Sequence, residues 1–217
     1  MNSNIMAYGD IHGCYKAAET AVILAEGLKA RAVFLGDYVD RGPASMGVLE
    51  VLFNAHEKHP DWIFLRGNHD QMLLDLINGQ RHPENFDERT EREAYAEWER
   101  SPSEIKNKVV DFLNTTMLFY ETDQTIFVHA PLIETGRPIN QKTTDELIWN
   151  YDLEPKWLRK RFIHGHKPTD EISFFGHGVN INTNCGYGGV LTGLLIKNNT
   201  VDDYYLFSVA EDGRVMD

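Results

Sequence analysis

Three short polar blocks, each directly after an apolar run, constrain the fold of this 217-residue chain most strongly. They are GDIHG at 9–13, GDYVDRG at 36–42 and GNHD at 67–70. The runs 5–8, 32–35 and 62–65 predict β-strands, and the amphipathic stretches 15–29 and 45–57 predict helices between them. Such an alternation is typical of βαβ units in a parallel sheet. The blocks should therefore meet at the carboxyl edge of one sheet, where open α/β sheets bind ligands.

The remainder of the chain predicts further strands and one charged insertion. We expect a hairpin from 117–121 and 125–128, a short strand at 161–163, and an antiparallel tail with strands at 179–181, 190–196 and 204–209. The segment at about 80–116 is crowded with charge and predicts a helical insert, either a solvated excursion or one wall of a substrate cleft. The chain is thus predicted to be one α/β (α+β, four-layer) domain over 1–217, with two mixed sheets packed as a sandwich flanked by helices.

Composition limits the class of partner and the compartment. A net charge of −12 without a basic block disfavours nucleic acid. No apolar stretch has the length of a signal peptide or of a membrane span, so we expect a cytoplasmic protein that makes no membrane contact. Cys14 and Cys185 are too few for a disulfide framework and are expected to be reduced and buried. The oligomeric state is left open, with a monomer favoured.

The polar blocks supply ligands that suit divalent metal ions. Asp and Asn oxygens and His nitrogens follow the first three strands, and single histidines follow two later apolar runs. This set suits two divalent ions, with manganese favoured and iron or zinc as alternatives, and the central Asp37 is the natural bridge. The predicted ligands are Asp10, His12, Asp37, Asn68, His129 and His166.

Two ions about 3.5–4 Å apart would hold a bridging hydroxide and orient a phosphoryl group for in-line attack. His69 lies beside the ligand Asn68 and is not needed as a ligand, so we predict that it is the general acid, oriented by Asp40. Arg41 and Arg66 flank the blocks and are predicted to bind phosphate oxygens.

These motifs together resemble the metallophosphoesterase superfamily, and within it the phosphoprotein phosphatase family in its small bacterial and phage branch. The similarity rests on GDIHG, GDYVDRG, RGNHD, the dipeptide 129–130 and HGHKP at 164–168. The resemblance implies that one ion is held by Asp10, His12 and Asp37, and the other by Asp37, Asn68, His129 and His166. It also implies the same roles for His69 and Asp40, and in part for Arg41 and Arg66.

The chain departs from the family pattern at several positions near the blocks. Asp70 stands where Glu is usual, and Tyr151 lies where the branch commonly carries a phosphate-binding arginine. The sequence leaves open which of three arginines, if any, replaces it: Arg137, Arg159 or Arg161. Further departures are Pro131, Lys167 and the stretch INTNC at 181–185, where the family usually has Asp-Thr-Gly.

Three functions are consistent with this pattern. The favoured one is a metal-dependent phosphomonoesterase acting on phosphoserine or phosphothreonine in proteins and peptides, extending to phosphotyrosine and small phosphate esters. The alternative keeps the dinuclear chemistry but hydrolyses diadenosine polyphosphates or other nucleotides. A non-catalytic binding scaffold is the third hypothesis, and it is disfavoured because the whole ligand set and His69 are present.

Overall fold

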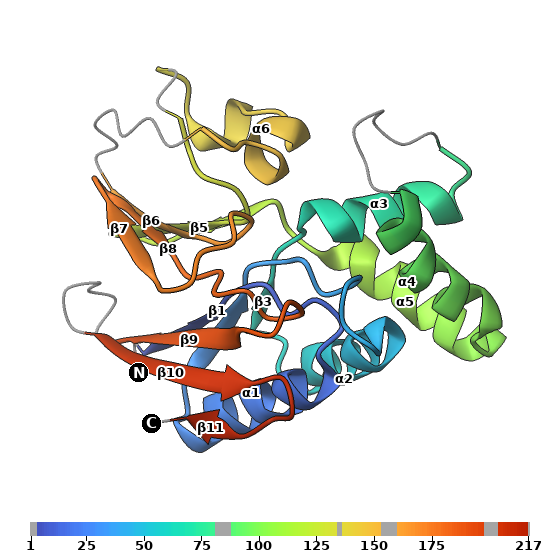
Figure 1. Cartoon of the computed structure of the whole chain (residues 1–217). Helices are drawn as coiled ribbons and strands as arrows, with labels where there is room; N and C mark the ends of the chain where they lie inside the picture. Colours follow the sequence, from blue (N-terminus) through green and yellow to red (C-terminus); the bar gives the residue numbers. More distant parts are fainter. Residues whose placement is uncertain (1–3, 81–87, 134–135, 153–159, 198–203, 217) are drawn as a thin grey trace.

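Two mixed β-sheets packed face to face form the centre of the computed structural model (Figure 1). The structure describes residues 4–80, 88–133, 136–152, 160–197 and 204–216. Within these ranges no helix combines the length and the apolar character needed to cross a bilayer.

The first sheet contains the three predicted strands that precede the polar blocks. Its order is β11 (Val215–Met216), β10 (Tyr204–Ala210), β9 (Val190–Ile196), β1 (Ile5–Tyr8), β2 (Arg31–Phe34) and β3 (Ile63–Phe64). β1, β2 and β3 are parallel, as predicted, whereas β9, β10 and β11 continue the sheet in antiparallel pairing. The carboxyl ends of β1, β2 and β3 therefore lie at one edge, and the blocks follow them.

The second sheet carries the strands that precede the two later histidines. Its order is β4 (Phe119–Glu121), β5 (Thr125–Val128), β6 (Arg161–His164), β8 (Gly178–Asn180) and β7 (Ser173–Phe175). The predicted hairpin is confirmed as β4 and β5. The prediction that β8 belongs to an antiparallel tail is wrong, since β8 pairs parallel to β6. A three-residue strand carries no local information about its partner strand, which is fixed by long-range packing.

Helices cover both outer faces and complete four layers. Side chains of α1 (Tyr15–Gly27) and α2 (Ser45–Lys58) form one hydrophobic core with the first sheet, and α6 (Thr144–Ile148) forms another with the second. β1 shows how the layers are built: Met6 and Tyr8 face the helices, whereas Ile5 and Ala7 face the interior between the sheets. A strand buried on both faces must be apolar throughout, which explains its unbroken apolar run.

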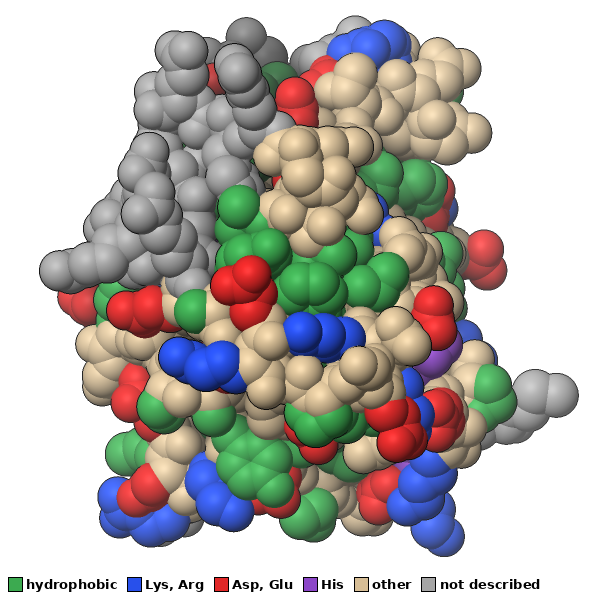
Figure 2. All heavy atoms as spheres, turned by 90° about the vertical axis from the view of Figure 1, so that its right-hand side faces the viewer, with side chains coloured by type: hydrophobic (Ala, Val, Ile, Leu, Met, Phe, Trp, Pro, Cys, Tyr) green, Lys and Arg blue, Asp and Glu red, His purple; other side chains and the backbone are tan. Residues whose placement is uncertain are grey.

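The charged insert packs against the body of the protein. It forms α4 (Glu88–Arg100) and α5 (Ser103–Thr115), which lie beside α2 and α3 (Asn68–Ile77) (Figure 1). Ala94 of α4 and Phe112 and Leu113 of α5 are buried in the core. The interpretation as a solvated excursion is therefore wrong for these helices. On the outer face seen in Figure 2, basic, acidic and hydrophobic side chains are intermixed and form no continuous basic surface.

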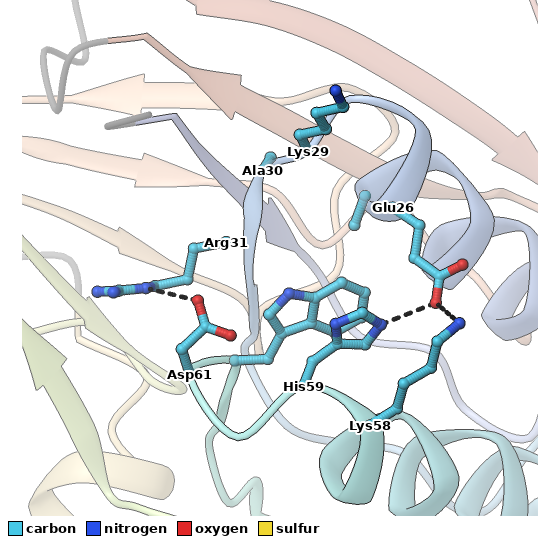
Figure 3. Close-up of a pocket in the computed structure, with 9 residues that line it drawn as sticks. Glu26, Lys29, Ala30, Arg31, Lys58, His59 and Asp61 are labelled. Carbon is cyan, nitrogen blue, oxygen red and sulfur yellow. Dashed lines mark hydrogen bonds and ion pairs between the residues drawn. The ribbon is translucent and has the colours of Figure 1, made fainter. Parts of the chain in front are cut away.

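A cavity of about 580 Å³ lies at the opposite end of the first sheet, next to the amino ends of β2 and β3 (Figure 3). Its charges are largely paired: Lys58 Nζ lies 2.7 Å and His59 Nε2 2.8 Å from Glu26 Oε1, and Arg31 lies 3.7 Å from Asp61. Lys58 and His59 also stand at the carboxyl end of α2, where positive charge stabilises the helix dipole. We assign a structural role to the charged residues that line this cavity.

Candidate metal centre and active site

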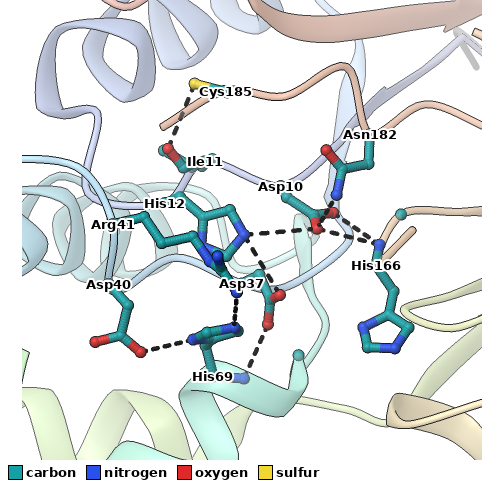
Figure 4. A network of polar contacts seen from close by, with 12 residues as sticks. Asp10, Ile11, His12, Asp37, Asp40, Arg41, His69, His166, Asn182 and Cys185 are labelled. Carbon is teal, nitrogen blue, oxygen red and sulfur yellow. Dashed lines mark hydrogen bonds and ion pairs between the residues drawn. The ribbon is translucent and has the colours of Figure 1, made fainter. Parts of the chain in front are cut away.

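All six predicted metal ligands lie together in one buried cluster, and Figure 4 shows four of them, Asp10, His12, Asp37 and His166. Each of them follows a strand of one of the two sheets, and none is more than 5% exposed. Asn68 is the first residue of α3. The sandwich therefore brings ligands from both sheets to a common edge.

Asp37 is the centre of this cluster. Its Oδ2 lies 3.6 Å from His12 Nε2 and 3.5 Å from His129 Nε2. Two groups of donor atoms, each within 4.8 Å of one another, share this carboxylate: one with His12 and His69, the other with His129 and His166. A carboxylate common to two donor groups is what a bridging ligand of two neighbouring ions requires.

Two of the predicted histidine ligands, His12 and His129, have the orientation that is common for metal-binding histidines. The Nδ1 atoms of His12 and His129 donate to the carbonyl oxygens of Val39 at 2.9 Å and Leu35 at 3.0 Å. Since a carbonyl can only accept, each Nδ1 carries a proton, and each Nε2 is left facing Asp37.

Three features of this donor set fit divalent cations. Burial lowers the pKa of His12 to about 3, so its neutral Nε2 presents a lone pair to the Asp37 carboxylate, and a cation would relieve this contact. His166 Nε2 is buried without a hydrogen-bond partner among the described residues. Asn68 Oδ1 lies 2.9 Å from both His129 Nε2 and His166 Nδ1, so the ligands predicted for the second ion converge.

Asp10 is held at the edge of the cluster by a residue that sequence reasoning missed. Its Oδ2 accepts a hydrogen bond of 2.6 Å from Asn182 Nδ2, and the backbone N–H of His166 donates to both of its oxygens at 3.2 and 3.1 Å. Asp10 Oδ2 lies 3.9 Å from His12 Nε2. The departure INTNC at 181–185 was the only sequence signal that pointed to Asn182.

Asp70 fixes the backbone around Asp37. Its Oδ2 accepts from the N–H groups of Asp37 at 2.8 Å and Gly67 at 2.9 Å, and its Oδ1 accepts from that of Tyr38 at 2.9 Å. Asp37 adopts the left-handed backbone region with φ 53°, which an L-residue occupies only when its surroundings enforce it. The shorter side chain at this position therefore still holds the Asp37 carboxylate in place.

Glycines next to the carboxylates leave no room for a side chain. A Cβ on Gly67 would lie 2.1 Å from Asp37 Oδ1, and one on Gly165 would lie 1.9 Å from Asp10 Oδ1. The glycines of the RGNHD and HGHKP motifs are thus required by close approach to the cluster.

The predicted acid–base pair is formed beside the ligands. His69 Nδ1 lies 2.7 Å from Asp40 Oδ2, and Arg41 Nη2 donates to His69 Nε2 at 3.1 Å. Burial raises the pKa of Asp40 to about 8 and lowers the pKa of His69 to about 4. Because Nε2 accepts from Arg41, the ring proton of neutral His69 lies on Nδ1, which donates to Asp40 Oδ2.

Negative charge is concentrated in this cluster. Burial raises the pKa of Asp10 and of Asp70 to about 7, and the nearby Asp37 charge adds to both shifts. Burial also acts to raise the pKa of Asp37, but His129, His69 and His12 hold it well below its usual range. Bound cations would stabilise the ionised form of all three carboxylates.

The predicted phosphate-binding arginines differ in their surroundings. Arg41 contacts His69 and lies over the ring of Tyr187, with its Cζ 4.5 Å from the ring centroid. Arg66 instead donates to Thr116 Oγ1, Gln71 Oε1 and the Leu113 carbonyl, at 2.9, 2.9 and 2.6 Å. These bonds give Arg66 a structural role between α3 and the end of α5, and a phosphate contact of Arg66 stays a prediction.

Two of the three arginines considered as replacements near Tyr151, Arg137 and Arg161, do not lie in the cluster. Arg137 pairs with Glu146 and is exposed, and Arg161 begins β6 at the end away from His166. Arg159 lies outside the described residues. Tyr151 itself is 55% exposed, and its ring centroid lies 4.3 Å from that of His166.

Comparison with known proteins identifies the family. The profile of the calcineurin-like phosphoesterases matches residues 3–203. The chain belongs to this family. It is a metallophosphoesterase, as the motifs and the sandwich fold indicate.

Similar proteins include enzymes named for different substrates. An asymmetrical bis(5'-nucleosyl)-tetraphosphatase, PrpE, from Bacillus mycoides (strain KBAB4) is 26% identical, with 86% of this chain and 87% of the relative covered. A solved structure named "putative diadenosine tetraphosphatase" has a TM-score of 0.71 at 18% identity, covering 96% of this chain and 94% of that one. A protein serine/threonine phosphatase from Saccharomyces cerevisiae has a TM-score of 0.63 at 16% identity, covering 95% and 79%.

We predict that Asp70→Asn weakens metal binding by about 10- to 100-fold, the range typical for groups that orient metal ligands. An amide keeps only one accepting oxygen, so part of the support for the Asp37 and Gly67 backbone is lost. Titration calorimetry with Mn²⁺ on protein freed of metal measures the effect. Asp111→Asn, an exposed site on α5, is the control, and equal affinities in the two variants would contradict the role of Asp70.

Proposed function

We propose that this metallophosphoesterase hydrolyses dinucleoside polyphosphates, with an asymmetrical cleavage of diadenosine tetraphosphate into ATP and AMP. The observation that carries the proposal is the similarity to PrpE relatives, which extends over 86% of this chain. The sequence alone favoured phosphoproteins, and the relatives support the nucleotide alternative instead. The donor groups that share Asp37 fit two divalent ions, which would supply an activated water and positive charge for the phosphoryl oxygens.

Exposed aromatic rings beside the cluster support a nucleotide substrate. Tyr187 is 53% exposed, covers Arg41 and stands edge-on to His12, with ring centroids 6.1 Å apart. Tyr151, 55% exposed, stands over His166 on the other donor group. Aromatic rings of this kind stack on nucleobases without requiring a particular sequence of bases.

The acid–base pair and Arg41 supply the remaining chemistry. The attacking water releases one proton to solvent as its oxygen bonds to phosphorus in line, the bond from phosphorus to the leaving oxygen breaks, and the leaving oxygen takes a proton from His69 Nε2, which solvent later replaces. In the structure that nitrogen accepts from Arg41, so Arg41 must turn to the substrate phosphate before His69 can carry a proton there. Arg41 thus links phosphate binding to the release of the acid.

A second candidate function has support from the acid–base pair. An alkoxide such as the serine oxygen of phosphoserine needs protonation as it leaves, whereas a polyphosphate is already a stable anion. The 2.7 Å contact between His69 and Asp40 equips the site for alkyl esters as well. Hydrolysis of phosphoserine peptides is therefore the alternative, in line with the phosphatase that shares the fold.

The substrate proposal is tested by comparing diadenosine tetraphosphate with phosphoserine and phosphothreonine peptides at saturating Mn²⁺. We expect kcat/KM for the dinucleotide to be higher by about tenfold or more, which corresponds to ~1.4 kcal/mol of transition-state stabilisation. Chromatography should show ATP and AMP in equal amounts. Preference for the peptides would support the alternative, and no hydrolysis of either class by metal-loaded protein would revive the binding-scaffold hypothesis.

We predict that His69→Asn lowers kcat for phenyl phosphate by about 10²–10⁴-fold, the range of general acid catalysis. The loss for diadenosine tetraphosphate should be smaller, because its leaving group needs less protonation. Metal content, measured by mass spectrometry, should be unchanged. His177→Asn, at an exposed turn, is the control. Equal losses on both substrates would contradict the assignment of His69 as the acid.

A further inference from the structure

The acid–base pair depends on a loop whose backbone is strained. Asp40 and Arg41 both adopt the left-handed region, with φ 68° and 69°. Asp tolerates this conformation better than most residues but Arg does not, and two such residues in succession need neighbouring groups to hold them. The position of the Asp40 carboxylate against His69 therefore depends on the groups that hold residues 40–45 in place.

The anchor of this loop is the first turn of α2. The backbone N–H of Asp40 donates to Ser45 Oγ at 2.9 Å, and Ser45 is the first residue of that helix and is buried. The N-cap residue Ala44 has no side chain that can accept a hydrogen bond, and the Ser45 hydroxyl oxygen is committed to Asp40. The unpaired N–H groups that begin every helix need another acceptor here.

Glu97 of the insert helix α4 supplies that acceptor. Its Oε1 accepts from the N–H of Ser45 at 3.3 Å and its Oε2 from the N–H of Met46 at 2.9 Å, across 52 and 51 residues of sequence. The negative charge also suits the amino end of a helix. Ala94, one turn earlier in α4, is buried in the core beside this contact. α4 is thus connected to the acid–base pair through Glu97 and the start of α2.

We propose that Glu97 is a positioning residue for general acid catalysis, holding Asp40 against His69 through Ser45 and the start of α2. The insert then has a function that neither of its sequence-based interpretations gave it. This inference rests on the part of the proposed function in which His69 protonates the leaving group, and it does not depend on the natural substrate. A purely structural cap would stabilise the fold and affect all substrates alike.

The test compares two aryl phosphates that differ in the need for an acid. Phenyl phosphate has a basic leaving group, whereas p-nitrophenyl phosphate releases a stable anion. In Glu97→Ala we expect kcat to fall about tenfold more for phenyl phosphate than for p-nitrophenyl phosphate, as for a partly misplaced general acid. Glu97→Gln, which keeps one accepting oxygen, should recover part of the difference. Glu99→Ala, exposed on the same helix, is the matched control and should match the wild type.

A double variant decides whether Glu97 acts through His69. In a His69→Asn background, Glu97→Ala should leave the ratio of the two kcat values unchanged, because residues that act as one unit are not additive. Equal losses on both substrates in Glu97→Ala, or an additive loss in the double variant, would overturn the proposal. Thermal unfolding checks that each variant is folded at the assay temperature. If Glu97→Ala is unfolded there, the comparison of the two substrates is made with Glu97→Gln instead.

The same assay separates this proposal from the substrate proposal. Wild-type protein that hydrolyses aryl phosphates but not diadenosine tetraphosphate overturns the nucleotide proposal alone, and the Glu97 comparison still stands. Wild-type protein that hydrolyses neither overturns both.

Discussion

The burial of several carboxylates in one place is the constraint on which this structure depends. Asp10, Asp37, Asp40 and Asp70 are each at most 2% exposed, and burial acts to raise the pKa of every one of them. Like charges so placed are costly unless cations or hydrogen bonds compensate them. The protein provides backbone N–H groups for Asp70 and His69 for Asp40. For Asp37 it provides histidines whose Nε2 atoms face the same carboxylate, and divalent ions bound between them would complete the compensation.

The fold serves this cluster by bringing together strand ends that are distant in sequence. The parallel strands β1, β2 and β3 deliver the three polar blocks, and β5 and β6 of the facing sheet deliver His129 and His166. The chain leaves each strand through tight, strained turns: His12, Asp37, Asp40, Arg41 and His166 all have positive φ. Such conformations persist only in a rigid setting, which the buried sandwich, Asp70 and the cap of α2 provide.

Much of this was predictable because it is local. Strand, polar block and helix alternate within short stretches, so the parallel sheet, the six ligand positions and the pair of His69 and Asp40 could be expected from sequence. Contacts made across many residues could not be predicted: the pairing of β8 with β6, the bond from Asn182 to Asp10, the cap that Glu97 places on α2, and the use of Arg66 between helices. The motifs also could not predict the substrate, because the chemistry at phosphorus is the same for nucleotides and phosphoproteins.

Anomalous X-ray diffraction from crystals grown with Mn²⁺ tests the central claim, a dinuclear centre built on Asp37, most directly. Two anomalous peaks about 3.5–4 Å apart are expected, the spacing of two-metal phosphoesterase sites, with the Asp37 carboxylate between them. One should lie next to His12 and the other next to His129 and His166. A single peak, or two peaks that do not share Asp37, would contradict the account.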